Sequence, residues 1–155
     1  MSKVLFVCLG NICRSPMAEA VFKKQVVDAG LSEKIQVASA GTSSWEAGNL
    51  PHAGTQDILK KHGISCDSMF STQVTPKDFV TYDYILAMDQ NNLRELKKGA
   101  TASQLAKLHL FLENSPESGY TEVPDPYYTG DFELTYQLVN KGCQGWLETI
   151  KKAVT

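Results

Sequence analysis

The feature that most constrains the fold is a short apolar run near the N-terminus, followed by a tight loop and a helical pattern. Residues 4–7 read Val-Leu-Phe-Val, a run of strand formers that is typical of a strand buried on both faces. The run stops before Gly10 and Asn11, which both tolerate left-handed backbone. Apolar residues then recur at helical spacing over residues 18–29, and Gly30 is expected to end that helix. A strand, a loop and a helix in this order predict the first part of a βαβ unit.

The rest of the chain repeats this alternation of short strands with helices. Further strands are predicted at residues 35–40, 84–87 and 105–112. Further helices are predicted around Ile58 and Leu59 with Gly63 as the stop, over residues 90–98, and over residues 132–154. Such alternation predicts a parallel sheet with helices on both faces. We therefore expect a single three-layer α/β domain over residues 1–155, in which a four-stranded parallel sheet is flanked by helices and the ligand-binding loop follows the first strand.

Composition and charge exclude several classes of protein. The 155 residues are 43% hydrophobic and 21% charged, which is close to the globular average and argues against disorder or a long coiled coil. The net charge of −2 gives no basic field for nucleic acid. No apolar run approaches the ~18 residues needed to cross a membrane, and the N-terminal run is too short for a signal peptide. We expect a cytoplasmic monomer that does not insert into membranes and whose four cysteines are normally reduced.

The loop after the first strand carries the chemistry. Cys8 stands at the end of the strand and Arg14 six residues later, where the helix begins. A tight loop can turn successive backbone N–H groups inward to bind an anion, and the start of a helix adds unpaired N–H groups and a positive dipole end. Arg14 adds a fork of donors that matches two oxygens of a tetrahedral oxyanion. A cysteine in that positive field is expected to be a thiolate, so the pattern predicts a nucleophile aimed at the phosphorus of a phosphate ester.

The residues around this pair narrow the possibilities further. The loop lacks the Gly-Lys-Ser/Thr ending of a Walker loop and the spacing of a dinucleotide fingerprint. Ser15 and Pro16 are typical of an N-cap and a first helical position. We expect the phosphate-binding loop to comprise, besides Cys8 and Arg14, the residues Leu9, Gly10, Asn11, Ile12, Cys13 and Ser15.

A phosphate ester also needs a proton donor for its leaving group. Asp125 is the candidate because it sits in the Pro-rich segment 123–126, which would hold a carboxyl in a fixed place. An Asp-Pro pair is equally typical of turn initiation. The residues alone therefore leave both roles of Asp125 open.

Residues 7–16 resemble the signature of the low-molecular-weight protein tyrosine phosphatases. Three further stretches agree in order and spacing: residues 39–42, 83–89 and 125–128. The resemblance covers nearly the whole chain. It implies hydrolysis of phosphotyrosine in protein substrates through a phosphocysteine, with Cys8 as nucleophile, Arg14 as phosphate clamp, and Asp125 as general acid and then base. Because the thiolate and Arg14 supply nucleophile and charge, and no His, Cys or Asp cluster has metal-ligand spacing, we expect no metal and no cofactor.

The resemblance also implies roles for residues around the nucleophile. Ser15 would donate its hydroxyl hydrogen to the Cys8 sulfur, and the side chain of Asn11 would tie the loop to Ser39 and His62. From the residues alone, a histidine before a glycine helix stop is more often a capping partner, so we treat His62 as structural support.

Cys13 and three aromatic residues complete the set of candidates. Cys13 is by default a small buried residue, and the resemblance implies a disulfide with Cys8 under oxidation. Trp45 lies in a polar loop, where it either folds over the edge of the core or walls the substrate cleft. The resemblance favours the cleft for Trp45, and for Tyr127 and Tyr128 beside the candidate acid.

The chain departs from many bacterial members of the family at the rim of this cleft. Residues 51–53 read Pro-His-Ala where an acidic-x-Arg stretch is common, and residues 71–72 read Ser-Thr shortly before Gln73, where an arginine is common. The rim is therefore less basic than usual, which bears on peptide preference rather than on the chemistry.

Three other functions remain open on the loop alone. Arsenate reductases use the same Cys-x5-Arg loop but need further redox cysteines, and residues 67–142 contain none. Phosphocarriers of the IIB type hold phosphate on a loop cysteine, whereas Arg14 together with Asp125 favours hydrolysis. A binding module without enzymatic activity, with Cys8 and Cys13 as a redox switch, is the third.

Overall fold

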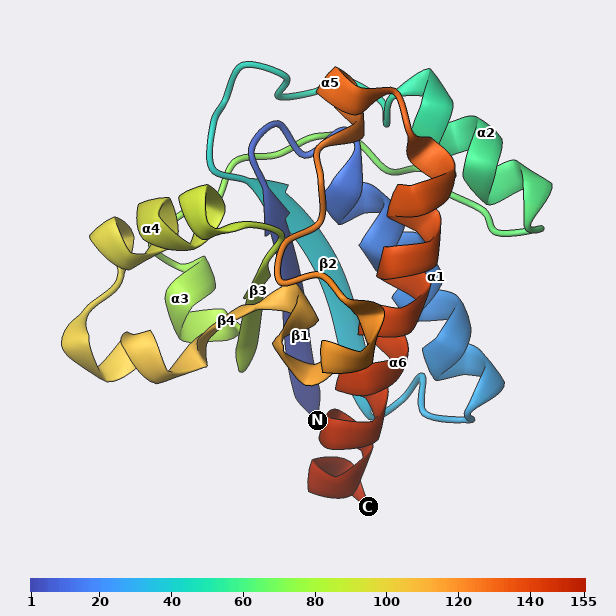
Figure 1. Cartoon of the computed structure of the whole chain (residues 1–155). Coiled ribbons are helices and arrows are strands. Elements are labelled where there is room, and N and C mark those ends of the chain that lie inside the picture. The colour runs from blue at the N-terminus through green and yellow to red at the C-terminus, as the bar shows by residue number, and fades with distance from the viewer.

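A four-stranded parallel sheet forms the centre of the structure, a computed structural model that describes residues 1–155. The strand order is β2-β1-β3-β4, and all three pairings are parallel. The strands are β1 (Ser2–Cys8), β2 (Ile35–Gly41), β3 (Tyr84–Ala87) and β4 (Leu108–Leu110). Figure 1 shows the sheet between two layers of helices. The predicted fold class is confirmed.

Helices cover both faces of the sheet. The larger helices α1 (Arg14–Asp28) and α6 (Phe132–Val154) pack on one face, and α2 (Ala53–Lys61) packs against both of them (Figure 1). The short α3 (Asp78–Thr81) and α4 (Gln90–Gly99) lie on the other face, and α5 (Pro126–Thr129) precedes α6. No helix is both long enough and apolar enough to span a membrane.

The alternation of side chains along β1 divides the core into two parts. Val4 and Phe6 point into the core beneath α1 and α6, whereas Leu5 and Val7 point toward α3 and α4. Phe6 is fully buried, and its ring meets the ring of Phe22 edge-on at a centroid distance of 5.5 Å. These contacts on both faces fix β1, and therefore the position at which the following loop begins.

One predicted strand differs from the structure, and the short helix α3 was not predicted. The predicted strand over residues 105–112 is only three residues long and lies between 3₁₀ helices at Ala102–Lys107 and Phe111–Asn114. β4 is an edge strand whose only partner, β3, is itself four residues long, so the ladder ends after three pairs. α3 was not predicted, because four residues are too few to show a helical period.

The start of α1 also differs from the prediction. The helix begins at Arg14 with Cys13 at the N-cap, so the predicted capping role of Ser15 is wrong. The hydroxyl of Ser15 lies 3.0 Å from the Cys8 sulfur instead. At the other end, Gly30 has a left-handed φ of 72° directly after the C-cap residue, which confirms the predicted stop.

Candidate active site

The loop between β1 and α1 turns its carbonyl groups outward. Asn11 adopts a left-handed φ of 56°, which reverses the chain at the centre of the loop. Five carbonyls accept hydrogen bonds from surrounding segments. The pairs are Thr42 N to Cys8 O (2.9 Å), Ser43 N to Leu9 O (3.0 Å), Ser71 Oγ to Gly10 O (2.8 Å), His52 N to Ile12 O (2.7 Å) and Thr55 Oγ1 to Cys13 O (3.1 Å). These bonds hold the loop from outside and leave its inner side to the N–H groups.

The N–H groups of the same loop have no such partners. None of those in residues 9–15 donates to a backbone carbonyl. Consecutive unpaired N–H groups followed by the N-terminus of a helix form an oxyanion site, because partial positive charges and the positive dipole end coincide. A cavity lies at this loop. Its lining residues are Cys8, Leu9, Gly10, Ile12, Cys13, Arg14, Trp45, Glu46, Asp125, Tyr127 and Tyr128.

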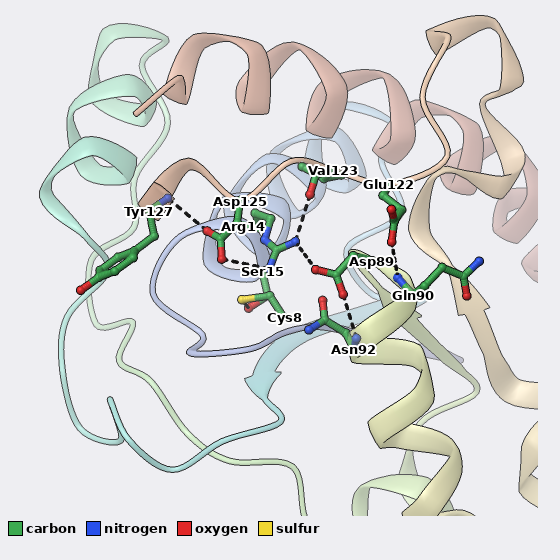
Figure 2. A network of polar contacts seen from close by, with 10 residues as sticks. All are labelled: Cys8, Arg14, Ser15, Asp89, Gln90, Asn92, Glu122, Val123, Asp125 and Tyr127. Carbon is green, nitrogen blue, oxygen red and sulfur yellow. Dashed lines mark hydrogen bonds and ion pairs between the residues drawn. The ribbon is translucent and has the colours of Figure 1, made fainter. Parts of the chain in front are cut away.

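Arg14 is buried and held along one edge of its guanidinium group (Figure 2). Its Nη1 donates to Asp89 Oδ2 at 2.7 Å and to Val123 O at 2.9 Å. Its Nη2 lies 3.3 Å from Asp125 Oδ2, and its buried Nε has no partner. Burial alone would lower the pKa of Arg14, but the negative charges of Cys8, Asp125 and Asp89 outweigh burial and raise it above the usual value. The side chain is thus a fixed cation whose Nε is free to donate to an anion, and an anion that replaces Asp125 at Nη2 would gain a second donor.

A chain of hydrogen bonds leads from the Cys8 sulfur into the protein. Ser15 Oγ lies 3.0 Å from the sulfur and accepts a 2.7 Å hydrogen bond from Asn11 Nδ2. The same amide nitrogen donates to Ser39 Oγ at 3.0 Å, and Ser39 donates in turn to Glu19 at 2.6 Å. Because the Ser15 oxygen already accepts from Asn11, its own hydrogen is free to point at the sulfur, as the predicted role of Ser15 requires.

His62 takes no part in this network, so its predicted support of Asn11 is wrong. The second polar atom of the Asn11 side chain, Oδ1, accepts from Thr72 N at 3.0 Å instead. α2 contacts the loop near its N-terminus, through Thr55, whereas His62 follows its last residue, roughly 10 Å further along the helix axis. There the His62 ring stacks on Tyr136 of α6 with the centroids 3.9 Å apart.

Asp125 begins a turn and also lies at the cavity that contains Cys8. It is the N-cap of α5, where its Oδ1 accepts from Tyr127 N at 3.1 Å, so it does begin a turn. Its Oδ2 faces Arg14, and the carboxyl lines the same cavity as Cys8 (Figure 2). The structure therefore brings together the three residues predicted to be catalytic.

Three exposed aromatic side chains stand around the cavity. Trp45 is 81% exposed, Tyr127 58% and Tyr128 77%, and all three line the cavity. The rings of Tyr127 and Tyr128 meet edge-on with their centroids 5.3 Å apart. Trp45 therefore does not fold over the core, and the cavity walls suit an aromatic group.

A sequence model described as low molecular weight phosphotyrosine protein phosphatase matches residues 3–155. The chain belongs to this family. It is 47% identical over 152 residues to "Low molecular weight protein-tyrosine-phosphatase YfkJ" of Bacillus subtilis, an alignment that covers 98% of the chain and 97% of that relative. It is 47% identical over 149 residues to the "Low molecular weight phosphotyrosine protein phosphatase" of Homo sapiens, which covers 94% and 93% of the two chains.

Solved structures agree with this assignment. The crystal structure of YfkJ superposes with a TM-score of 0.97 at 46% identity, covering 100% of this chain and 98% of that one. A structure described as DARP, a Drosophila arginine phosphatase, has a TM-score of 0.86 at 38% identity, covering 96% and 98%. The predicted family and enzyme class, a protein tyrosine phosphatase, are therefore confirmed.

The sequence did not identify two residues of the phosphatase site. Asp89 holds Arg14 in place, and Glu46 lines the cavity beside Trp45. A signal for Asp89 was available, because it follows β3 at the carboxyl edge of the sheet, where ligand-binding residues of such folds gather. Glu46 gave no signal beyond its place next to Trp45.

The cysteines of the phosphatase differ sharply in their surroundings, and none of the four is in a disulfide. Burial, followed by the negative charges of Cys8 and Asp125, raises the pKa of Cys13 to about 12. Burial also raises the pKa of Cys143, which lies on the inner side of α6 in the core. Cys13 and Cys143 are therefore neutral thiols at physiological pH.

Proposed function

We propose that the enzyme hydrolyses phosphotyrosine in proteins through a phosphocysteine on Cys8. The observation that carries this mechanism is the loop itself. A cysteine sulfur lies where seven consecutive residues, 9–15, direct no N–H group to a backbone carbonyl, and Arg14, whose Nε has no partner, lines the same cavity. That is the geometry needed to hold three phosphate oxygens while a nucleophile approaches the phosphorus.

In the first step, the Cys8 thiolate attacks the phosphorus and the bond to the tyrosine oxygen breaks. The loop N–H groups and Arg14 hold the equatorial oxygens, while Asp125 gives its proton to the departing oxygen. The substrate also prepares this acid. Its phosphate oxygens compete with Asp125 for Nη2 of Arg14, the longest of the three Arg14 hydrogen bonds at 3.3 Å. Binding of the substrate therefore releases the Asp125 carboxyl from Arg14, so that it can turn to the departing oxygen.

In the second step, water attacks the phosphorus of the phosphocysteine. Asp125, now a carboxylate, takes a proton from this water, the sulfur–phosphorus bond breaks, and inorganic phosphate leaves. The Ser15 hydroxyl, 3.0 Å from the sulfur, stabilises the thiolate as it departs.

The exposed aromatic walls favour phosphotyrosine over smaller phosphorylated side chains. A phenyl ring between Trp45 and Tyr128 would bury apolar surface that serine or threonine lacks. The relative described as an arginine phosphatase makes phosphoarginine the competing substrate.

A panel of four peptides with the same flanks tests this proposal: phosphotyrosine, phosphoserine, phosphothreonine and phosphoarginine. We expect phosphotyrosine to give the highest kcat/KM, with activity unchanged by a chelator, since Cys8 and Arg14 supply the nucleophile and the charge. A higher kcat/KM for phosphoarginine would overturn the substrate assignment while leaving the phosphocysteine in place. Acid-quenched enzyme without phosphate on Cys8 would overturn the mechanism.

We also infer that the enzyme works as a monomer in the cytoplasm. Cys8, Arg14 and Asp125 of a single chain line the same cavity, so the three proposed catalytic residues come together without a second subunit. A thiolate nucleophile needs the reducing conditions of the cytoplasm to stay active. Sedimentation equilibrium at working concentrations tests the monomer.

Mild peroxide is expected to inactivate the enzyme reversibly by linking Cys8 to Cys13. Peroxide converts the Cys8 thiolate to a sulfenic acid, and the Cys13 sulfur then displaces the oxygen as water. Because the pKa of Cys13 is raised to about 12, little Cys13 thiolate exists at neutral pH. The rate of linking should therefore rise about tenfold per pH unit from neutral to mildly alkaline solution.

Peptide mass spectrometry after peroxide pulses at several pH values measures this linking. Cys13→Ser should remove the linked peptide and let Cys8 proceed to sulfinic and sulfonic acids, which dithiothreitol does not reverse. Only sulfonic acid at Cys8 in the unaltered enzyme, with no linked peptide, would contradict the prediction.

A further inference from the structure

Glu122 attaches the segment that carries Asp125 to the start of α4. Its Oε2 accepts a hydrogen bond from Gln90 N at 2.6 Å (Figure 2). Gln90 is the first residue of α4, so this N–H has no acceptor within the helix. A carboxylate at that position also interacts favourably with the positive end of the helix dipole. Asp89 takes up another free donor of the same helix, through Oδ1 to Asn92 N at 2.8 Å.

The segment before Asp125 has few other attachments. Its backbone is held at Val123, whose N–H donates to Met88 O at 2.9 Å and whose carbonyl accepts from Arg14 at 2.9 Å. The contact of Asp125 with Arg14 is longer, at 3.3 Å, and Arg14 is also the residue that must hold the substrate. Together with the bond from Val123 N to Met88 O, Glu122 therefore supplies an attachment that does not depend on whether phosphate is bound, and it is the one made by a side chain of the segment.

We propose that Glu122 is a positioning residue for the general acid. By binding the N-terminus of α4, it keeps residues 122–125 in place when the phosphate replaces Asp125 at Nη2 of Arg14, so that Asp125 stays directed at the leaving oxygen. This inference rests on the proposed role of Asp125. The inference concerns the hydrogen bond from Gln90 N to Glu122 and not the negative charge of Glu122. Substitutions can separate the effect of the bond from that of the charge.

Removing the bond from either side gives the main test. Glu122→Ala removes the acceptor, and Glu122 is exposed, so the fold is expected to tolerate this change. Gln90→Pro removes the donor. Proline is favoured at the first position of a helix, and Asp89 before it already has the extended backbone, φ −146° and ψ 173°, that a residue preceding proline needs. Glu122→Gln keeps an oxygen acceptor and loses the charge. The matched control is Glu117→Ala, which removes an exposed carboxylate from the same connection before α5.

The readout is single-turnover release of phenols of graded pKa. We expect Glu122→Ala and Gln90→Pro to slow release of the most basic phenols roughly tenfold, a part of the ~10²–10⁴-fold that a general acid contributes. Release of the most acidic phenol and the rate of Cys8 alkylation by iodoacetate should change less than twofold. Glu122→Gln and Glu117→Ala should resemble the unaltered enzyme. The double variant Glu122→Ala with Gln90→Pro should be no slower than either single variant, since both remove the same bond.

Three results would overturn the inference. One is a loss of rate in Glu122→Ala that is equal for all phenols, because the role of Glu122 would then be structural. A loss that Glu122→Gln shares would also overturn it, because the role would then be electrostatic. The third is Gln90→Pro with a melting temperature and a phenol dependence both like those of the unaltered enzyme. If Asp125→Asn itself shows no dependence on phenol pKa, the proposed function fails first and independently.

Discussion

Cys8→Ser is expected to abolish turnover while keeping the affinity for oxyanions. The loop N–H groups and Arg14 do not depend on the sulfur, so the anion site survives the substitution. A serine hydroxyl in the same place is un-ionised at neutral pH and is a far weaker nucleophile than a thiolate. We expect kcat to fall at least about 10⁴-fold, as losses of covalent nucleophiles in other enzymes suggest. Stopped assays with aryl phosphates measure the loss, and calorimetric titration with inorganic phosphate or vanadate measures the binding.

Cys66→Ser is the matched control for this experiment. Cys66 is a half-buried thiol outside the cavity, so the same chemical change there should leave kcat within twofold. A Cys8→Ser enzyme that keeps more than a tenth of the activity would rule out the covalent mechanism. Loss of both turnover and phosphate binding would instead mean that the loop had collapsed, and it would contradict the claim that the loop is held from outside by its carbonyls.

The parts of the fold that the sequence predicted well are those with strong local patterns. The run at residues 4–7 became a strand buried on both faces, and the apolar stripe of the last helix became α6. Both are packed against the largest parts of the core, so local preference and tertiary packing agree. The strand predicted at β4 was too long, because the length of an edge strand depends on its partner, which lies far away in the sequence.

The site was predictable where one motif carries it, and less so where distant segments meet. Cys8 and Arg14 share a loop, so their spacing alone suggested an anion site. The hydrogen bond of Arg14 to Asp89 joins residues that are 75 positions apart, and the bond of Glu122 to Gln90 joins residues 32 apart. No spacing rule connects such pairs, because the sheet order brings them together. His62 was misplaced for the same reason, since which end of α2 touches the loop depends on packing.

Asp125→Asn is expected to slow the first step, and the loss of rate should be larger for leaving groups whose oxygen is more basic. The substitution removes the proton but keeps the size of the side chain, and an amide oxygen can still accept from Tyr127 N and cap α5. Phosphotyrosine and phenyl phosphate have basic leaving oxygens, so we expect a loss of ~10²–10⁴-fold in their first step. An ester with an acidic phenol departs well as an anion and should lose far less. Hydrolysis of the phosphocysteine should slow as well, because Asp125 is also the proposed base that activates water.

The decisive measurement is single-turnover phenol release by the unaltered enzyme and by Asp125→Asn across phenols of graded pKa. The deficit of the variant should grow with phenol pKa, and its pH profile should lose the limb that reports a protonated acid. A deficit that stays constant would exclude Asp125 as the acid. The structure then leaves Asp89 as the stronger candidate, because it binds Arg14 beside the cavity, whereas Asp131 caps α6 through Leu134 N and does not line the cavity. Both carboxylate oxygens of Asp89 are already engaged, Oδ2 by Arg14 Nη1 at 2.7 Å and Oδ1 by Asn92 N at 2.8 Å, whereas the Asp125 side chain lines the cavity itself, so Asp125 is better placed to reach the leaving oxygen.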